Sequence, residues 1–344
     1  MSDPTVSLPP GARICVVLLT GVGDVVHGLP LVNALKRHDP SCRITWVAEP
    51  VPAGIVEHHP AVDEVVVFRK KDGARGVMGL ARSLRGRRFD VTLNLNIYFK
   101  SIFPTVLSRA PVRVGFDRGR ARDGVWLFAN RPLPERSRAH TQDMFLEFLA
   151  LMGVEPRPLE WHLGPTPEEA AERDRFFQRF SRPVVAVVPA SANAKKDWPA
   201  ERYGPVLDAL ESDLGVDTMI VGGPSVRERA LTDRILASTR AEPEVALVDG
   251  IRRVLWLLSG SHLVIAPDTG PVHMARAMDV PVVGLYGHTN PWRVGPYRRY
   301  QDLWVDAYTE PGEAPDPSNA TPKLDRMERI TPEQVLDRVR RVLS

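Results

Sequence analysis

Short apolar runs alternate along this chain with longer stretches in which apolar residues recur at helical spacing. Five runs of strand length lie in the first half, at residues 13–19, 44–48, 64–68, 90–95 and 112–115. Five more lie in the second half, at residues 184–188, 218–221, 245–248, 263–266 and 282–285. Strands that alternate with helices form parallel sheets that helices cover on both faces. The pattern therefore predicts an α/β protein with two doubly wound, Rossmann-like domains.

A segment typical of a linker separates the two halves. It contains a Pro- and Gly-rich stretch at residues 163–167, a charged helical stretch at 168–179, and Ser181-Arg182-Pro183. Because domain boundaries fall in such segments, we expect one domain over residues 1–165 and a second over residues 182–325.

The end of the chain carries two further patterns. Residues 308–322 are rich in Pro, Glu, Asp and Ala, which predicts an irregular surface connector. Residues 326–344 include a helical pattern with no strand after it. We expect this last helix to pack back on the first domain.

Composition adds only limits. The chain has 344 residues, of which 43% are hydrophobic and 25% charged, as in ordinary globular proteins. Cys15 and Cys42 lie in or beside predicted strands, which indicates core thiols in a reducing compartment. No run of about 18 uncharged apolar residues occurs, and the first residues lack the pattern of a signal peptide. We therefore expect a cytoplasmic protein.

One polar turn follows the first predicted strand. The turn, Thr20–Asp24, leads into a helical pattern over residues 25–35. A dinucleotide-binding fingerprint would require a third glycine where Val26 stands, although Glu49 roughly fits the acidic residue of such a fingerprint. The dinucleotide interpretation is weakened and stays open.

Asp24 is the distinctive residue of this turn. A helix N-terminus favours the ionised form of a carboxylate. An ionised carboxylate at the mouth of a sheet can act as a general base. A helix-capping role fits the same position equally well.

A second polar turn lies between the strand pattern at 263–266 and a helical pattern that begins at Val272. The turn contains Asp268-Thr269-Gly270, and backbone N–H groups at a helix start bind phosphate. Asp268 itself would repel a phosphate, so it more plausibly orients the turn or accepts hydrogen bonds from hydroxyl groups. An ordinary capped helix is the alternative.

Charge is concentrated in one part of the first half. The whole chain carries a net charge of only +3, which does not favour nucleic acid. Residues 69–122, however, contain fourteen Lys or Arg and three Asp. This excess predicts a basic face for an anionic acceptor or an anionic membrane surface. A solvated arginine-rich surface is the alternative, and RNA binding is disfavoured because aromatic residues are scarce among these positions.

Several segments together resemble glycosyltransferase family 9, the ADP-heptose:lipopolysaccharide heptosyltransferases and their relatives. The resemblance runs along nearly the whole chain, and its most specific element is the D-T-G-x-x-H signature at residues 268–273. Gly21–Pro30 resembles the family's amino-terminal turn, and Lys196–Pro199 resembles its K-x-W-P element. Further similarities lie at Ala121-Arg122-Asp123, at His140, and at Gly222, Gly223 and Glu228.

The resemblance implies a fold and a mechanism. The fold would be GT-B, two Rossmann-like domains that face each other across a cleft, with the acceptor in the first and a nucleotide-sugar donor in the second. The mechanism would be an inverting, metal-independent transfer with Asp24 as the base and Lys196 on the donor diphosphate. Backbone donors of the D-T-G turn would help Lys196 to stabilise the leaving group. The His and carboxylate spacings resemble no metal site, and we expect no cofactor.

The resemblance also implies two sets of binding residues. The donor, with ADP-heptose the one expected, would meet Lys195, Lys196, Gly222, Gly223, Glu228, Asp268, Thr269, Gly270 and His273. The acceptor, an anionic glycolipid of the lipopolysaccharide core or a related one, would meet Gly23, His27, Asn96, Lys100, Arg118, Arg120 and Arg122. Such an acceptor implies peripheral contact with the inner face of the inner membrane.

The chain departs from the family pattern in its acceptor segment. Where many heptosyltransferases have D-x-Q-G-x-x-K-S, residues 94–101 keep only Lys100 and Ser101. The arginine expected shortly after His140 is also missing. The acceptor can therefore differ from the usual inner-core sugar. Two other classes of function stay open: a nicotinamide-dependent oxidoreductase, and a non-catalytic protein that binds sugar nucleotides.

Overall fold

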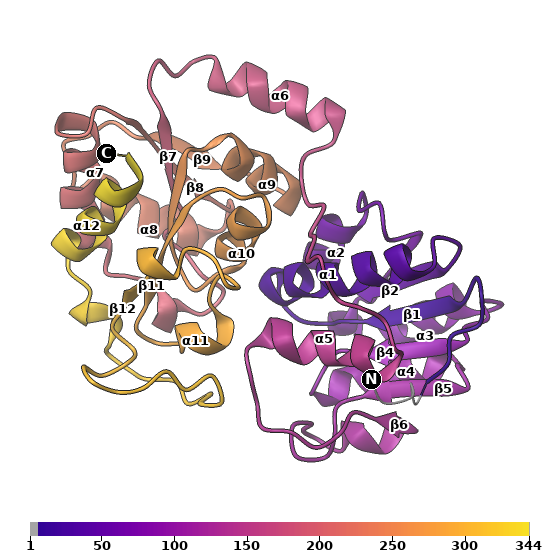
Figure 1. Ribbon diagram of the computed structural model, residues 1–344. Coiled ribbons are helices and arrows are strands. Elements are labelled where there is room, and N and C mark those ends of the chain that lie inside the picture. Colours follow the sequence, from indigo (N-terminus) through magenta and orange to yellow (C-terminus); the bar gives the residue numbers. More distant parts are fainter. Residues whose placement is uncertain (1–5, 344) are drawn as a thin grey trace. The chain divides into compact units, whose positions relative to one another are not determined.

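The computed structural model describes residues 6–343 (Figure 1). Residues 1–5 and 344, which the expected domain bounds include, lie outside the described residues. The chain divides into two compact units, Met1–His162 (unit 1) and Leu163–Ser344 (unit 2).

Unit 1 contains one parallel sheet whose strands follow the order β3-β2-β1-β4-β5-β6. The strands are β1 (Arg13–Val17), β2 (Arg43–Ala48), β3 (Glu64–Val67), β4 (Val91–Asn94), β5 (Val112–Gly115) and β6 (Arg131–Pro132). The helices are α1 (Val22–His38), α2 (Pro50–Val56), α3 (Gly73–Leu84), α4 (Ile102–Leu107) and α5 (Thr141–Leu151), with short 3₁₀ turns η1 (Lys70–Asp72), η2 (Phe99–Ser101) and η3 (Val125–Phe128). The strand order reverses between β1 and β4, and ligands bind at the carboxyl ends of strands at such a point.

Unit 2 repeats this plan with the order β12-β11-β10-β7-β8-β9. Its strands are β7 (Val184–Val187), β8 (Asp217–Gly222), β9 (Glu244–Leu247), β10 (Leu263–Pro267), β11 (Val282–Tyr286) and β12 (Val305–Asp306). Its helices are α6 (Pro167–Phe177), α7 (Tyr203–Ser212), α8 (Val226–Leu236), α9 (Ile251–Gly260), α10 (Gly270–Ala277), α11 (Pro291–Val294) and α12 (Pro332–Leu343). The short 3₁₀ turns are η4 (Ala194–Lys196), η5 (Ala200–Arg202), η6 (Gln301–Leu303) and η7 (Met327–Arg329). Here the order reverses between β7 and β10.

The two sheets confirm the predicted α/β architecture of two doubly wound domains. Every residue of β4, β7, β10 and β11 is buried, because helices cover both faces of a parallel sheet. Cys15 and Cys42 are buried free thiols, and burial raises the pKa of Cys15 to about 12. A thiol with so high a pKa is a core residue and not a nucleophile.

The helix expected in the linker is a packed part of unit 2. Thr166 caps α6 in a reciprocal pair with Glu169. Arg252 of α9 binds Glu169 and donates to the carbonyl of Gly164 at 3.0 Å. The charged sequence of α6 suggested a solvated connector. The Glu169 carboxylate, however, pairs with Arg252, more than eighty residues away along the chain.

The last helix also belongs to unit 2, so the expectation that it packs on the first domain is corrected. Val335, Leu336 and Val339 of α12 are buried in one cluster with residues of α7. Arg338 donates to the carbonyl of Trp304 at 3.3 Å. The apolar stripe of α12 showed that one face is buried, but helical spacing does not say against which element it is buried.

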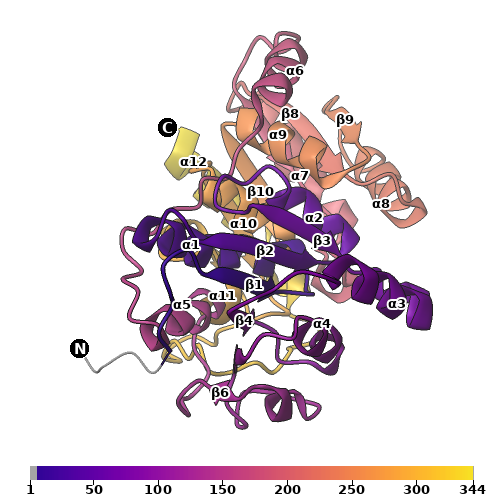
Figure 2. The same cartoon turned by 90° about the vertical axis from the view of Figure 1, so that its right-hand side faces the viewer.

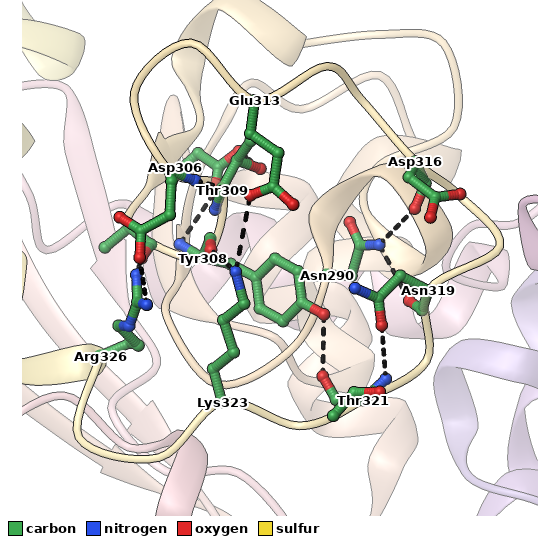
Figure 3. A network of polar contacts seen from close by, with 12 residues as sticks. Asn290, Asp306, Tyr308, Thr309, Glu313, Asp316, Asn319, Thr321, Lys323 and Arg326 are labelled. Atoms are coloured by element: carbon green, nitrogen blue, oxygen red, sulfur yellow. Dashed lines mark hydrogen bonds and ion pairs between the residues drawn. The ribbon is translucent and has the colours of Figure 1, made fainter.

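The predicted irregular connector has no helix or strand over residues 308–322, yet side chains tie it down (Figure 3). The Asn290 amide donates to the carbonyls of Asp316 and Asn319 at 2.7 and 2.9 Å. The Tyr308 hydroxyl donates to the carbonyl of Thr321 at 2.8 Å, and Lys323 donates to the carbonyl of Tyr308 at 2.7 Å. The connector is thus a folded loop that closes over the segment after β11.

Candidate active site

The centre of the candidate site in unit 2 is Asp268, directly after β10. Its side chain is buried, and its Oδ2 atom accepts from Lys196 Nζ at 2.7 Å and from Thr289 Oγ1 at 2.8 Å. His273 Nε2 lies 3.8 Å from the other carboxylate oxygen. Burial alone would raise the pKa of Asp268, but the hydrogen bond from His273 and the charge of Lys196 hold it well below its usual range. Asp268 is therefore a fixed anion at the switch point of the sheet.

Lys196 comes from the loop after β7, and the geometry of that loop aims it at Asp268. Asp197 accepts hydrogen bonds from the backbone N–H and the hydroxyl of Ser191, at 2.8 and 2.9 Å, and it also binds Arg227. Trp198 is buried and donates to the carbonyl of Ile330 at 3.1 Å. The loop is therefore held on both sides of Lys196, whose side chain stays partly exposed beside the anion.

Lys195 points elsewhere. It is exposed and lines a surface groove of about 580 Å³ together with Arg227. The structure thus brings Lys196, and not Lys195, to the D-T-G turn.

The D-T-G turn leads into α10, which begins at Gly270, two residues earlier than the pattern predicted. Thr269 is the N-cap residue in an extended conformation, and Pro271 lies in the first turn. The first backbone N–H groups of a helix have no partner within it and carry a partial positive charge. Lys196 and this helix start therefore place positive charge on one side of the turn.

Gly222 ends β8, Gly223 begins the turn that follows it, and Glu228 lies in the first turn of the next helix, α8. The Glu228 carboxylate accepts from the Gly223 N–H at 2.8 Å and from the Ser225 hydroxyl at 2.5 Å. A Cβ atom at Gly223 would lie 2.9 Å from Glu228 Oε2, so a larger residue there would push the end of the Glu228 side chain away from the Gly223 N–H. In this structure Glu228 holds the turn in shape.

Sequence reasoning missed Thr289, which lies in the segment after β11. Its hydroxyl shares one oxygen of Asp268 with Lys196. The flanking residues His288 and Asn290 bind the loop that Figure 3 shows, so the backbone on both sides of Thr289 is held. A polar residue after a buried strand was the available signal, but no spacing connected Thr289 with Asp268.

In unit 1, the turn after β1 places Asp24 in the first turn of α1. Gly21 occupies the N-cap position, so Asp24 is not the N-cap residue, and it is partly exposed. Gly23 precedes it in the same turn of helix. His27 follows three residues later, which places it on the same helix face as Asp24.

His27 is buried between α1 and α5. Its Nδ1 atom lies 3.2 Å from Gln142 Oε1, and the Gln142 amide donates to the carbonyl of His27 at 2.8 Å. The rings of His27 and His140 meet edge to face with centroids 5.3 Å apart. These contacts set the position of α1 and thereby that of Asp24.

Two residues expected on the acceptor face belong to the core of unit 1. Asn96 is buried, accepts from the Leu19 N–H at 2.9 Å and donates to the carbonyl of Val17 at 2.9 Å. Arg120 is also buried and forms ion pairs with Asp117 and Glu147. Asn96 connects the ends of β4 and β1 by hydrogen bonds, and Arg120 forms ion pairs with two carboxylates. Neither side chain therefore lies on an exposed basic face.

The other basic candidates are more accessible. Lys100 binds Glu49 at 3.0 Å, and Glu49 also binds Lys70 at 2.6 Å. Burial and the neighbouring Lys70 lower the pKa of Lys100. Arg118 and Arg122 are exposed. Because Glu49 forms ion pairs with two lysines and Val26 is buried in α1, neither residue supports a dinucleotide site.

Among residues 6–343, none of the helices combines the length and the hydrophobicity that a membrane span requires. No group of three or more His, Cys, Asp or Glu side chains in that range is arranged to hold a metal ion.

Comparisons with known proteins point in one direction. A family model described as glycosyltransferase family 9 (heptosyltransferase) matches residues 77–314. The lipopolysaccharide core heptosyltransferase OpsX of Haemophilus influenzae is 30% identical over 298 residues, which are 86% of this chain and 85% of that protein.

Solved structures show the same fold. A family 9 glycosyltransferase from Veillonella parvula has a TM-score of 0.82 at 23% identity, and the match covers 98% of this chain and 99% of that chain. The heptosyltransferase WaaC of E. coli, solved with ADP, has a TM-score of 0.75 at 22% identity, and the match covers 96% of this chain and 99% of that chain.

Proposed function

The chain belongs to glycosyltransferase family 9 and is therefore a glycosyltransferase with a GT-B fold; we propose that it transfers heptose from ADP-heptose to a lipopolysaccharide-core or related glycolipid acceptor. The observation that carries the proposal is the set of Lys196, Asp268 and the start of α10 at the switch point of unit 2. The ADP in the similar E. coli structure and the activity named for the Haemophilus influenzae relative support the choice of donor.

Unit 2 would bind the donor and stabilise its departure. When the bond to the sugar breaks, negative charge grows on the diphosphate oxygen that leaves. The Lys196 ammonium and the N–H groups at Thr269 and Gly270 would stabilise that charge. Asp268 would hold the lysine in place through their 2.7 Å hydrogen bond. Glu228 and Gly222–Gly223 would contact the donor ribose.

Unit 1 would bind the acceptor and remove its proton. Asp24 would accept the proton of the acceptor hydroxyl as it attacks the anomeric carbon from the side opposite the diphosphate. A single displacement of this kind inverts the configuration at that carbon. Gly23 and His27 would border the acceptor, and Lys100, Arg118 and Arg122 would attract its anionic groups.

A donor panel tests the proposal. Purified full-length protein is incubated with ADP-heptose, other nucleotide sugars or NAD, with lipopolysaccharide-core acceptors, and products are identified by mass spectrometry. We expect heptose transfer from ADP-heptose, with inverted configuration by NMR. Because Lys196 and α10 supply the positive charge, a chelator should leave the rate unchanged. Binding of ADP-heptose without transfer to any acceptor would contradict the proposal.

A further inference from the structure

Several large apolar side chains of unit 1 are exposed close together. Phe99 is 53% exposed and Leu127 is 74% exposed. Tyr98, Phe103 and Val106 are exposed as well. We name these five residues the apolar patch. Contiguous exposed apolar surface on a folded protein marks an interaction site.

Contacts of α4 with η2 and η3 place the members of the patch on neighbouring segments. The rings of Phe99 and Phe103 meet edge to face with centroids 5.9 Å apart. Phe103 and Val106 are three residues apart on α4 and share its outer face, while Ile102 and Thr105 are buried on its inner face. Helix α4, which is labelled in Figure 2, also packs against η3, the segment that carries Leu127.

The segment after β5 joins the two sides of the patch. The Arg122 N–H donates to the carbonyl of Ile97 at 2.7 Å, directly before Tyr98. The Phe99 N–H donates to Asp123 at 3.4 Å. The patch therefore sits on a connected surface formed by three neighbouring segments.

Exposed arginines lie on or beside the segments that carry the apolar patch. The Arg122 guanidinium lies 5.9 Å from the centre of the Tyr98 ring, and Arg118 lies 5.7 Å from that of Trp126, next to Leu127. Arg109 follows the last turn of α4 and is also exposed. Asp123 is the exposed carboxylate at the patch, where it accepts from Phe99. Apolar side chains flanked by arginines complement the interface of an anionic bilayer, because the aromatic side chains enter the acyl boundary while arginines meet the lipid phosphates.

We propose that the apolar patch docks unit 1 on an anionic phospholipid bilayer and so brings the enzyme to its lipid-linked acceptor. The inference rests on the proposed function, because the patch includes Tyr98 and Phe99, which directly precede the acceptor candidate Lys100. An interface with a second copy of this chain is the competing explanation. It fits less well, because an excess of arginines around the same face would repel its own copy.

Vesicle flotation with the full-length protein tests the docking surface. Wild-type protein should float with phosphatidylglycerol–phosphatidylethanolamine vesicles, bind phosphatidylcholine vesicles much more weakly, and lose binding as salt rises. A Phe99→Ser/Leu127→Ser variant should bind the anionic vesicles about tenfold or more weakly. The matched control is Val226→Ser/Val245→Ser in unit 2, whose residues are 85% and 42% exposed, and it should bind like wild type.

Three results would overturn the docking proposal. One is equal binding by Phe99→Ser/Leu127→Ser and wild type, and another is an equal loss in the unit 2 control. The third is a dimer of wild-type protein that the variant breaks, with no vesicle binding by either. Leu127→Ser alone, at the most exposed position of the patch, keeps the test available should the double variant fold poorly.

An activity comparison separates this inference from the proposed function. With a deacylated, water-soluble core acceptor, Leu127→Ser, whose position lies outside the acceptor segment at residues 94–101, should transfer heptose at the wild-type rate. With the acceptor embedded in anionic vesicles, its rate should fall in parallel with vesicle binding. Absence of transfer by wild type on both acceptors would refute the proposed function, while the flotation result would still decide the docking surface.

Discussion

The two polar turns of this protein, after β1 in unit 1 and after β10 in unit 2, have the same topology but place their carboxylates differently. Both follow a buried strand beside the point where the strand order reverses. Asp268 precedes its helix, is buried, and is held by Lys196 and Thr289. Asp24 lies inside the first turn of its helix and is partly exposed.

This difference of a few residues along the turn decides what each carboxylate can do. A buried carboxylate that accepts from a lysine and a hydroxyl remains charged and positions the cation, so it is unsuited to proton transfer near neutral pH. A partly exposed carboxylate at a helix start is accessible to an acceptor hydroxyl. One topology thus supplies a positioning anion in unit 2 and a candidate base in unit 1.

The largest expected effect is at Asp24. Asp24→Asn keeps the size of the side chain but removes the proton acceptor, so the transfer rate should fall by about 10²–10⁴-fold. Binding of ADP-heptose to unit 2, measured by calorimetry, should stay near normal. A rate within tenfold of wild type would show that Asp24 is not the base, and the proposed difference in role between Asp24 and Asp268 would be wrong.

Lys196→Ala should lower both the transfer rate and the affinity for the donor. Loss of one charged group that stabilises a leaving diphosphate is expected to lower kcat by about 10²-fold. Lys195→Ala is the matched control, because the neighbouring lysine is exposed and lines a surface groove, and its effect should be much smaller. Similar losses in both variants would show that position beside Asp268 is unimportant.

Asp268→Asn tests the fixed charge through pH. The pKa of Asp268 is lower in the folded protein than its unfolded value of about 3.9, so its ionised form stabilises the fold above that value. The variant should melt about 5 °C or more below wild type at pH 7. That difference in Tm should shrink as pH falls below about 4. A difference that stays constant down to pH 3 would contradict a buried, ionised Asp268.

The smallest expected effect is at Thr289. Thr289→Val removes one hydrogen bond to Asp268, worth about 1 kcal/mol, or roughly fivefold in rate. As a positioning residue, Thr289 should affect kcat more than KM, and Thr289→Ser should restore the rate because it keeps the hydroxyl. Thermal melting separates a loss of fold from a loss of position. Equal kcat values for Thr289→Val and wild type would show that Lys196 alone holds the carboxylate in place.

The sequence alone predicted both sheets and the turns that end their central strands. Apolar runs of four to seven residues between helical patterns identify buried parallel strands without any knowledge of their partners. They identified five strands of each sheet, whereas the two-residue edge strands β6 and β12 are too short to give such a run. The D-T-G turn was likewise identifiable, because it follows such a strand, whereas Lys196 was identified by the resemblance of Lys196–Pro199 to the family's K-x-W-P element. That Lys196 contacts Asp268, across 72 residues of chain, was not written in any local pattern.

Only the tertiary structure decided which segments pack together and which charged side chains pair. The stripe on α12 showed a buried face, and the three-dimensional packing assigned it to unit 2. Composition made Arg120 and Lys100 members of one basic region, but Arg120 pairs with Asp117 and Glu147 in the core, and Lys100 shares Glu49 with Lys70. Periodicity and charge show which face of a segment is buried and which is polar. Which residues that face contacts depends on where distant segments of the chain fold. For that reason the sequence determined the sheets and the turns of this protein, and the tertiary structure alone decided which charges remain for a ligand.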